Sequence, residues 1–138
     1  MGLFDKFKKH ASEVKPLSDR FKQWLDPVLE NDIPSDIVAL SFNIYEDADK
    51  RWSVEVVGTS SFDENNDDWA CDEITDFSTR GNPFSWQEDT TWEEVLPIVK
   101  RLIQGYLESG NHSDKLGNLS GIACGFVDGD LELIYRKR

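Results

Sequence analysis

The sequence contains little of what usually assigns a chain to a familiar class. Cysteine occurs twice among 138 residues, at Cys71 and Cys124, with no spacing that suggests a disulfide framework. Such sparse cysteine excludes a disulfide-rich secreted domain and suits a reducing compartment. No apolar run approaches the roughly 20 residues that a membrane-spanning helix needs, and the opening MGLFDKFKKH has no apolar core of a secretory signal. We therefore expect a cytoplasmic protein that does not cross a membrane.

Motifs that hold metals, phosphates or a catalytic nucleophile are missing as well. The acidic run that begins at Asp63 matches a calcium loop at its first, third and fifth positions, but Asp68 stands where the loop needs Gly and Ile74 where it needs Glu. The two histidines and two cysteines are too far apart in sequence for a zinc motif. No glycine-rich phosphate loop is present. We expect inert, buried cysteines, no metal, no cofactor and no catalytic residue.

The chain is therefore expected not to be an enzyme. Carboxylate catalysis stays open as a third hypothesis, because 27 Asp and Glu residues make some close pair inevitable. Only geometry gives such a pair meaning, and a deep cavity with convergent carboxylates would favour it.

What the sequence does contain is aromatic side chains and acid. Five Trp and eight Phe indicate a folded chain, and 138 residues suffice for one buried core. The net charge of −12 divides into +3 for residues 1–25, −16 for residues 26–99 and +1 for residues 100–138. Such an acidic block repels nucleic acid and speeds the encounter with a basic protein. The alternative is that acid only keeps the protein soluble.

Apolar residues at helical spacing predict an N-terminal helical segment over residues 1–31. One helix covers residues 3–14, with Phe4 and Phe7 on its apolar face and lysines elsewhere. A second helix follows Pro16, and Pro27 is expected to break or restart it. A basic amphipathic helix can lie on a membrane surface, but most such stripes pack on a core.

Alternating apolar residues predict strands in the rest of the chain. The segments 37–45 and 52–62 form one hairpin, and a short strand is expected within residues 71–77. The segments 121–127 and 130–136 form a second hairpin, in which Asp128-Gly129 predicts a type I′ turn.

A long amphipathic helix lies between the two hairpins. Thr91 and Glu94 predict a capping box at its start, and its apolar stripe continues to about residue 109 before Gly110. We expect a single α+β domain over residues 1–138, whose core spans residues 37–136. It consists of an antiparallel sheet of two hairpins packed by the long helix, with N-terminal helices.

The acidic stretch SSFDENNDDWACDE, residues 60–73, places Trp69 among carboxylates, and Trp86 lies near further acid. Indoles ringed by complementary charge are typical of interface hot spots, although both could instead anchor the loop to the core. A polar loop of this length is more often functional or disordered than structural. The expected partner-binding residues are Asp63, Glu64, Asp67, Asp68, Trp69, Asp72, Glu73, Asp76 and Trp86.

The segments DENNDDWACDE and NPFSW, the Trp-led helix and the ending GFVDGDLELIY resemble a known type of protein over residues 37–136. They are similar to small acidic bacterial immunity proteins of polymorphic-toxin and contact-dependent inhibition systems. The resemblance implies a cytosolic protein that binds and blocks a toxin domain, often a basic nuclease, without catalysis. The basic first 25 residues depart from a uniformly acidic inhibitor. The alternative hypothesis is a peripheral regulatory module whose N-terminal helix binds a membrane or a partner.

Overall fold

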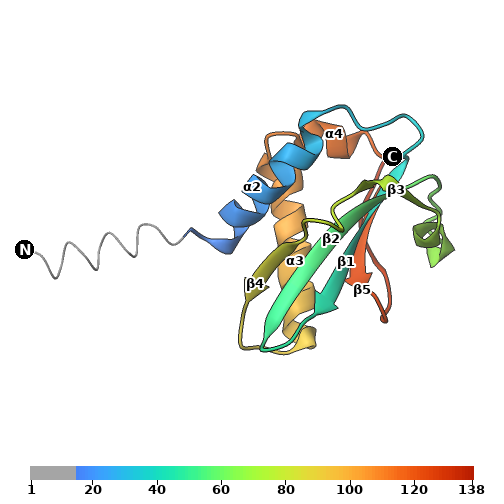
Figure 1. Cartoon of the computed structure of the whole chain (residues 1–138). Helices are drawn as coiled ribbons and strands as arrows, with labels where there is room; N and C mark the ends of the chain where they lie inside the picture. Colours follow the sequence, from blue (N-terminus) through green and yellow to red (C-terminus); the bar gives the residue numbers. More distant parts are fainter. Residues whose placement is uncertain (1–14) are drawn as a thin grey trace, which may run out of the picture.

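A mixed sheet with helices on one face forms the fold (Figure 1). The structure is a computed structural model that describes residues 15–138, so the helix predicted at residues 3–14 lies outside the described residues. The elements in chain order are α2 (Leu17–Glu30), β1 (Ala39–Glu46), β2 (Arg51–Thr59), η1 (Asp67–Cys71), β3 (Glu73–Ser78), β4 (Phe84–Gln87), α3 (Trp92–Ser109), α4 (Ser113–Gly117), β5 (Gly121–Phe126) and β6 (Glu132–Arg136). The α+β class predicted from the sequence is confirmed, including a long helix packed on the sheet.

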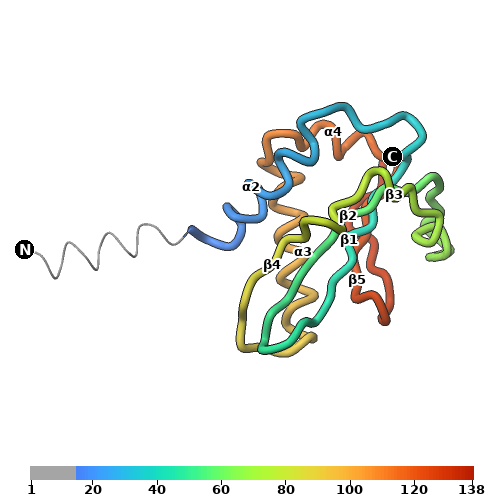
Figure 2. The backbone as a smooth tube through the Cα atoms, viewed as in Figure 1, coloured from blue at the N-terminus to red at the C-terminus, as the bar shows by residue number. Residues whose placement is uncertain are grey.

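The six strands form one sheet in the order β3-β2-β1-β5-β6, with β4 also pairing with β2 (Figure 2). All pairs are antiparallel except β1 and β5, which are parallel. The chain pairs β4 antiparallel to β2, so β4 runs in the direction of β1. A crossover is then needed before another parallel strand can form, and α3 provides it. The two predicted hairpins therefore meet through a parallel pair.

The main core lies between the sheet and helices α2 and α3. Leu40, Phe42 and Ile44 of β1 point into it, as do Trp52 and Val54 of β2, and all are fully or almost fully buried. Their period of two confirms the alternation read from the sequence. The helices contribute apolar stripes to the same core, among them Phe21, Leu25, Leu29, Val95, Val99, Ile103 and Tyr106.

Both long helices contain a proline that does not end them. Pro27 lies inside α2, so the predicted break there is wrong, and Pro97 lies near the start of α3, where a missing N–H matters least. Thr91 is the N-cap of α3 as predicted, but its side chain makes no capping hydrogen bond, so the capping box is not formed. At the end of α2, Lys115 Nζ donates to the carbonyls of Leu29 (2.6 Å), Glu30 (3.0 Å) and Asn31 (3.2 Å). These bonds satisfy carbonyls that a helix end leaves without partners.

A type I′ turn occurs in the hairpin of β1 and β2, and not in the hairpin of β5 and β6 where it was predicted. Asp49 and Lys50 each have φ of 59°, and the N–H of Arg51 donates to the carbonyl of Ala48 at 3.2 Å. Gly129 has no positive φ, so the type I′ turn predicted for Asp128-Gly129 is wrong. The loop between β5 and β6 is longer than two residues, which relaxes the requirement for a primed turn.

We expect Lys50→Gly to raise the free energy of unfolding by about 0.5–1 kcal/mol, because glycine adopts positive φ without the steric cost that a Cβ carries there. Gly129→Ala should leave that free energy unchanged or raise it by about 0.4–1 kcal/mol, since a Cβ there finds ordinary contacts and restricts the unfolded chain. Urea unfolding followed by tryptophan fluorescence measures both. A large loss of stability in Gly129→Ala would show that this turn does need a glycine.

Candidate functional site

The acidic segment forms a loop on the sheet face opposite the helices. It leaves β2, contains the short helix η1, and returns to the sheet as β3 (Figure 1). Phe62 and Trp69 pack together with ring centroids 5.2 Å apart, and both contact a small cluster with Ala39 and Ala123 of the sheet. The loop is therefore fastened by apolar side chains, although most of its residues are charged or polar.

Small residues on this face of the sheet make room for those rings. A Cβ on Gly121 would overlap the ring of Phe62, and the neighbouring positions on the same face are Ala39 and Ala123. Because glycine and alanine have no bulky side chain above the strand, an aromatic ring can pack directly on the backbone. Leu131, from the segment between β5 and β6, joins the same cluster and links that segment to the acidic loop.

Local hydrogen bonds fix the course of the loop. The side chain of Asp63 accepts from the N–H of Asn65 at 2.9 Å, and that of Asn66 accepts from the N–H of Asp68 at 3.0 Å, where Asn66 is the N-cap of η1. Ser61 donates to the Asp72 carboxylate at 2.6 Å. These are the side-chain-to-backbone bonds that Asn and Asp form in turns and caps, so the acidic loop has a defined conformation.

The predicted carboxylates are all on the surface. Asp63, Glu64, Asp67, Asp68, Asp72, Glu73 and Asp76 are exposed. The two predicted tryptophans are not: Trp69 is 4% exposed and Trp86 is 3% exposed. They also lie on opposite sides of the sheet, since Trp69 belongs to the cluster under the acidic loop and Trp86 to the main core. Neither can serve as the exposed anchor that we expected, because burial under neighbouring side chains removes an indole from contact with a partner.

Two of the carboxylates are neutralised within the chain. Glu64 pairs with Arg136 at 2.7 Å, and Glu73 pairs with Arg80 at 2.5 Å. Within residues 15–138 the other five carboxylates of the segment have no ion-pair partner. The unpaired negative charge of this segment therefore comes from its aspartates. Glu73 contributes mainly to the ion pair with Arg80.

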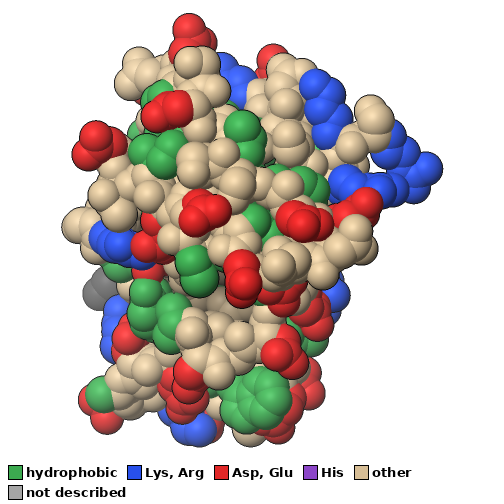
Figure 3. All heavy atoms as spheres, turned by 90° about the vertical axis from the view of Figure 1, so that its right-hand side faces the viewer, with side chains coloured by type: hydrophobic (Ala, Val, Ile, Leu, Met, Phe, Trp, Pro, Cys, Tyr) green, Lys and Arg blue, Asp and Glu red, His purple; other side chains and the backbone are tan. Residues whose placement is uncertain are grey.

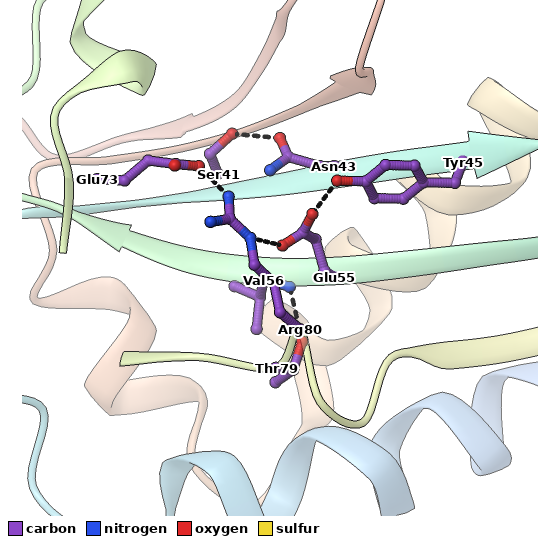
Figure 4. A network of polar contacts seen from close by, with 8 residues as sticks. All are labelled: Ser41, Asn43, Tyr45, Glu55, Val56, Glu73, Thr79 and Arg80. Carbon is purple, nitrogen blue, oxygen red and sulfur yellow. Dashed lines mark hydrogen bonds and ion pairs between the residues drawn. The ribbon is translucent and has the colours of Figure 1, made fainter. Parts of the chain in front are cut away.

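Beside this segment lies a buried carboxylate, Glu55 of β2, at the centre of a polar network (Figure 4). Arg80 donates to Glu55 Oε2 through Nε at 2.7 Å and to Glu73 through Nη2, and Tyr45 donates its hydroxyl to Glu55 Oε1. The Glu55 side chain is only 3% exposed, whereas that of Arg80 is 45% exposed. Arg80 thus covers the sheet face and supplies the charge that a buried carboxylate requires.

The same environment shifts the pKa of nearby groups. Burial, together with the hydrogen bond to Glu55, raises the pKa of Tyr45 to about 12. Hydrogen bonds to Glu73 and Glu55 raise the pKa of Arg80 above its usual value, so this guanidinium is charged at any physiological pH. Tyr45 therefore stays a hydroxyl donor and Arg80 a cation, which keeps the network intact.

The two cysteines differ in environment. Cys124 is buried in the main core, and burial raises its pKa to about 12, as expected for an inert thiol. Cys71 is exposed at the end of η1, so the prediction that both cysteines are buried is wrong for this one.

The acidic surface as a whole is seen by turning the molecule so that the η1 loop faces the viewer (Figure 3). Carboxylates are spread over this face, with small hydrophobic areas between them, and cationic side chains lie toward its edges, with the largest group at the upper right. Sequence reasoning missed an exposed aromatic residue within residues 15–138: Trp92, at the start of α3, is 55% exposed. The sequence pattern indicates only that Trp92 begins the helix, and it does not reveal that the side chain is exposed to solvent.

Among residues 15–138 no cluster of His, Cys, Asp or Glu has the arrangement of a metal site. Across the same residues no helix has the length and apolar character needed to span a bilayer. Comparisons of the chain with protein-family models, curated proteins and solved structures give no significant match. Function is therefore inferred from the geometry of the acidic surface.

We expect Arg80→Ala to lower the free energy of unfolding by about 2–3 kcal/mol, because Glu55 stays buried without its cation. This is less than the roughly 3–5 kcal/mol typical of a fully buried pair, since water can reach the place of a half-exposed guanidinium. Adding Glu55→Gln should restore most of the loss, because an amide needs no counter-charge. Urea unfolding of the single and double variants measures this coupling, and equal stability of the two would contradict the pairing.

We expect Gly121→Ala to lower the free energy of unfolding by about 1–3 kcal/mol and to loosen the acidic loop, because the added methyl displaces the Phe62 ring. Amide hydrogen exchange in residues 60–72 should accelerate. The matched control is Gly105→Ala in α3, where nothing lies within 4 Å and alanine should stabilise by up to about 1 kcal/mol. Unchanged exchange in the loop of Gly121→Ala would show that Phe62 does not fasten it.

Proposed function

We propose that this protein is an immunity-type inhibitor: it binds and blocks a basic toxin domain in the cytoplasm and catalyses no reaction itself. The observation that carries the proposal is the set of five exposed aspartates without an ion-pair partner within residues 15–138, held by an ordered loop and β3. Those residues are Asp63, Asp67, Asp68, Asp72 and Asp76.

A fixed arrangement of like charges favours binding over mere solubility. Solubility needs acid anywhere on the surface, and flexible side chains serve it equally well. Here the loop carries buried aromatic rings and side-chain caps that hold the carboxylates in place. A preorganised charged surface loses little entropy on binding, so more of its attraction to a cationic partner appears as affinity. Complementary charge also raises the rate of encounter.

The alternative of a membrane- or partner-binding helix depends on residues 3–14, which lie outside the described residues. No contact among residues 15–138 favours it. An immunity-type role is supported by the described part of the chain alone, and it is the role we propose.

The test is affinity capture from the native host with the tagged protein, followed by identification of the captured chain. We expect a basic protein, whose expression alone arrests growth and whose toxicity is relieved by co-expression of this protein. Asp67→Asn, Asp68→Asn and Asp76→Asn combined should slow its association about tenfold at low salt and weaken the salt dependence, because steering depends on these charges.

A matched control separates the acidic surface from net charge. Asp19→Asn, Glu108→Gln and Asp114→Asn combined change exposed carboxylates of the helical layer and alter the formal charge by the same three units, from −12 to −9. This control should associate like the unmodified protein. If both triple variants slow association equally, net charge and not this surface is responsible, and a captured protein that is acidic or harmless would overturn the proposal.

A further inference from the structure

A second feature of the molecule is a cavity of about 650 Å³. It lies where the end of β1, the start of α3 and the β5–β6 turn meet, and its apolar lining comes from Ile44, Trp92, Leu96 and Phe126. Pockets that hold small ligands or side chains are typically about 300–1,000 Å³. The cavity is thus large enough for a long side chain together with part of its backbone.

The apolar wall of the cavity is well supported. Trp92 packs edge-on against Phe126 with ring centroids 6.2 Å apart, and Phe126 packs in the same way on the buried Trp52, also at 6.2 Å. The indole of Trp92 nevertheless remains 55% exposed. A large aromatic ring that is held from behind and open in front is the arrangement seen at interface hot spots.

The opposite wall, formed by the β5–β6 turn, is also fixed. The N–H of Val127 donates to the carbonyl of Ile44 at 3.2 Å, and that of Gly129 to the carbonyl of Phe126 at 2.9 Å. Gly125 lets the backbone of Asp130 approach so closely that a Cβ would lie 2.5 Å from its carbonyl oxygen. The turn is therefore held against the sheet, and the cavity exists before any partner binds.

The rim of the cavity is acidic. Glu46, Asp128 and Asp130 are exposed there and have no ion-pair partner within residues 15–138. Glu132 also borders the cavity but lies 2.8 Å from Lys100, so its charge is already balanced. Among the described residues, no Lys or Arg lines the cavity. Apolar walls under an anionic rim suit a ligand with an apolar stem and a cationic end.

We propose that this cavity receives an arginine side chain of the basic partner, a proposal that rests on the proposed function and names its anchor. The methylene stem would lie along Ile44 and Leu96, as long cationic side chains commonly cover apolar surface. The guanidinium would stack on the exposed face of Trp92 and bond with Asp128 and Asp130. Arginine fits better than lysine, because its planar group stacks on aromatic rings and pairs with carboxylates in two-bond geometry.

Acid–base catalysis fits the cavity less well. A catalytic pair of carboxylates needs burial or close approach that separates their pKa values. Here three of the four carboxylates are exposed on the rim, and the fourth is in an ion pair. Such a rim suits recognition of positive charge.

The direct test uses two small probes and the indole N–H signals of the protein in NMR spectra. N-acetyl-arginine amide carries the proposed cation, and N-acetyl-citrulline amide is its neutral counterpart of nearly the same shape. We expect the arginine probe to shift the Trp92 signal, identified by its absence in Trp92→Phe, and to bind at least tenfold more tightly than the citrulline probe. Equal binding of both probes, or an unmoved Trp92 signal, would overturn the proposal.

Variants then locate the interaction. Asp128→Asn with Asp130→Asn should weaken binding of the arginine probe about tenfold, whereas Asp67→Asn with Asp68→Asn, in the η1 loop, should leave it unchanged. Both double variants change the formal charge by the same amount. An equal effect of the two would show general electrostatic attraction in place of a defined site.

The captured partner separates failure of this inference from failure of the proposed function. Trp92→Ala should speed dissociation of the partner at least tenfold, and Leu133→Ala, which removes another exposed apolar side chain from β6, should not. If the partner binds through the aspartates of the loop but ignores Trp92→Ala, the cavity is not its anchor and the inhibitor function stands. If no basic toxin is found while the arginine probe still binds at Trp92, the proposed function fails and the arginine site remains.

Discussion

The packing of Phe62 and Trp69 on a strip of small residues is the interaction on which the acidic surface depends. Carboxylates crowded into one loop repel one another, and at roughly 4 Å in water each such pair costs about 1 kcal/mol before salt screening. Burying one large apolar side chain contributes about 1.5–3 kcal/mol, so two aromatic rings outweigh several repulsive pairs. Gly121, Ala39 and Ala123 are small enough for the two rings to pack closely on the sheet. Burial of these uncharged side chains thus offsets the repulsion between the carboxylates of the loop.

The same sheet face shows how the chain uses its few cations. Residues 26–99 contain only three basic side chains against nineteen acidic ones, and one of the three, Arg80, is engaged with Glu55 and Glu73. Arg136, from β6, is engaged with Glu64. These cations neutralise carboxylates that the fold needs in fixed places, and none of the pairs includes an aspartate of the loop. Different residues therefore form the internal ion pairs and the unpaired surface charge. A substitution at Arg80 is expected to change the free energy of unfolding, because Arg80 pairs with none of the loop aspartates.

Periodicity predicted most of the fold. The features that it did not predict depend on very short segments or on contacts with residues far away in the sequence. The alternation of Leu40, Phe42 and Ile44 and the stripe of α3 report burial on one face, which a single segment is enough to reveal. Strand β4 has four residues after Pro83, too few for a period to appear. The burial of Trp69 could not be read from its acidic neighbours, because it is set by Gly121 and Ala123, some fifty residues away. The cavity beside Trp92 is likewise formed by three distant segments. Asp128-Gly129 did not form the predicted type I′ turn, because the loop between β5 and β6 is longer than two residues, and positive φ occurs instead at Asp49 and Lys50.

A loop of aspartates and a cavity beside an exposed indole would act at different ranges. Charge attraction in physiological salt decays over about 8 Å, so the loop would influence how often the proposed basic partner arrives, and most of that influence would disappear as salt rises. Contacts inside a cavity form only after arrival, and they govern how long the partner stays. Charge without an apolar anchor would give fast association and equally fast release. An inhibitor that must silence its target needs a long residence time, and under the proposed function the exposed ring of Trp92, held by Phe126 and Trp52, would supply it.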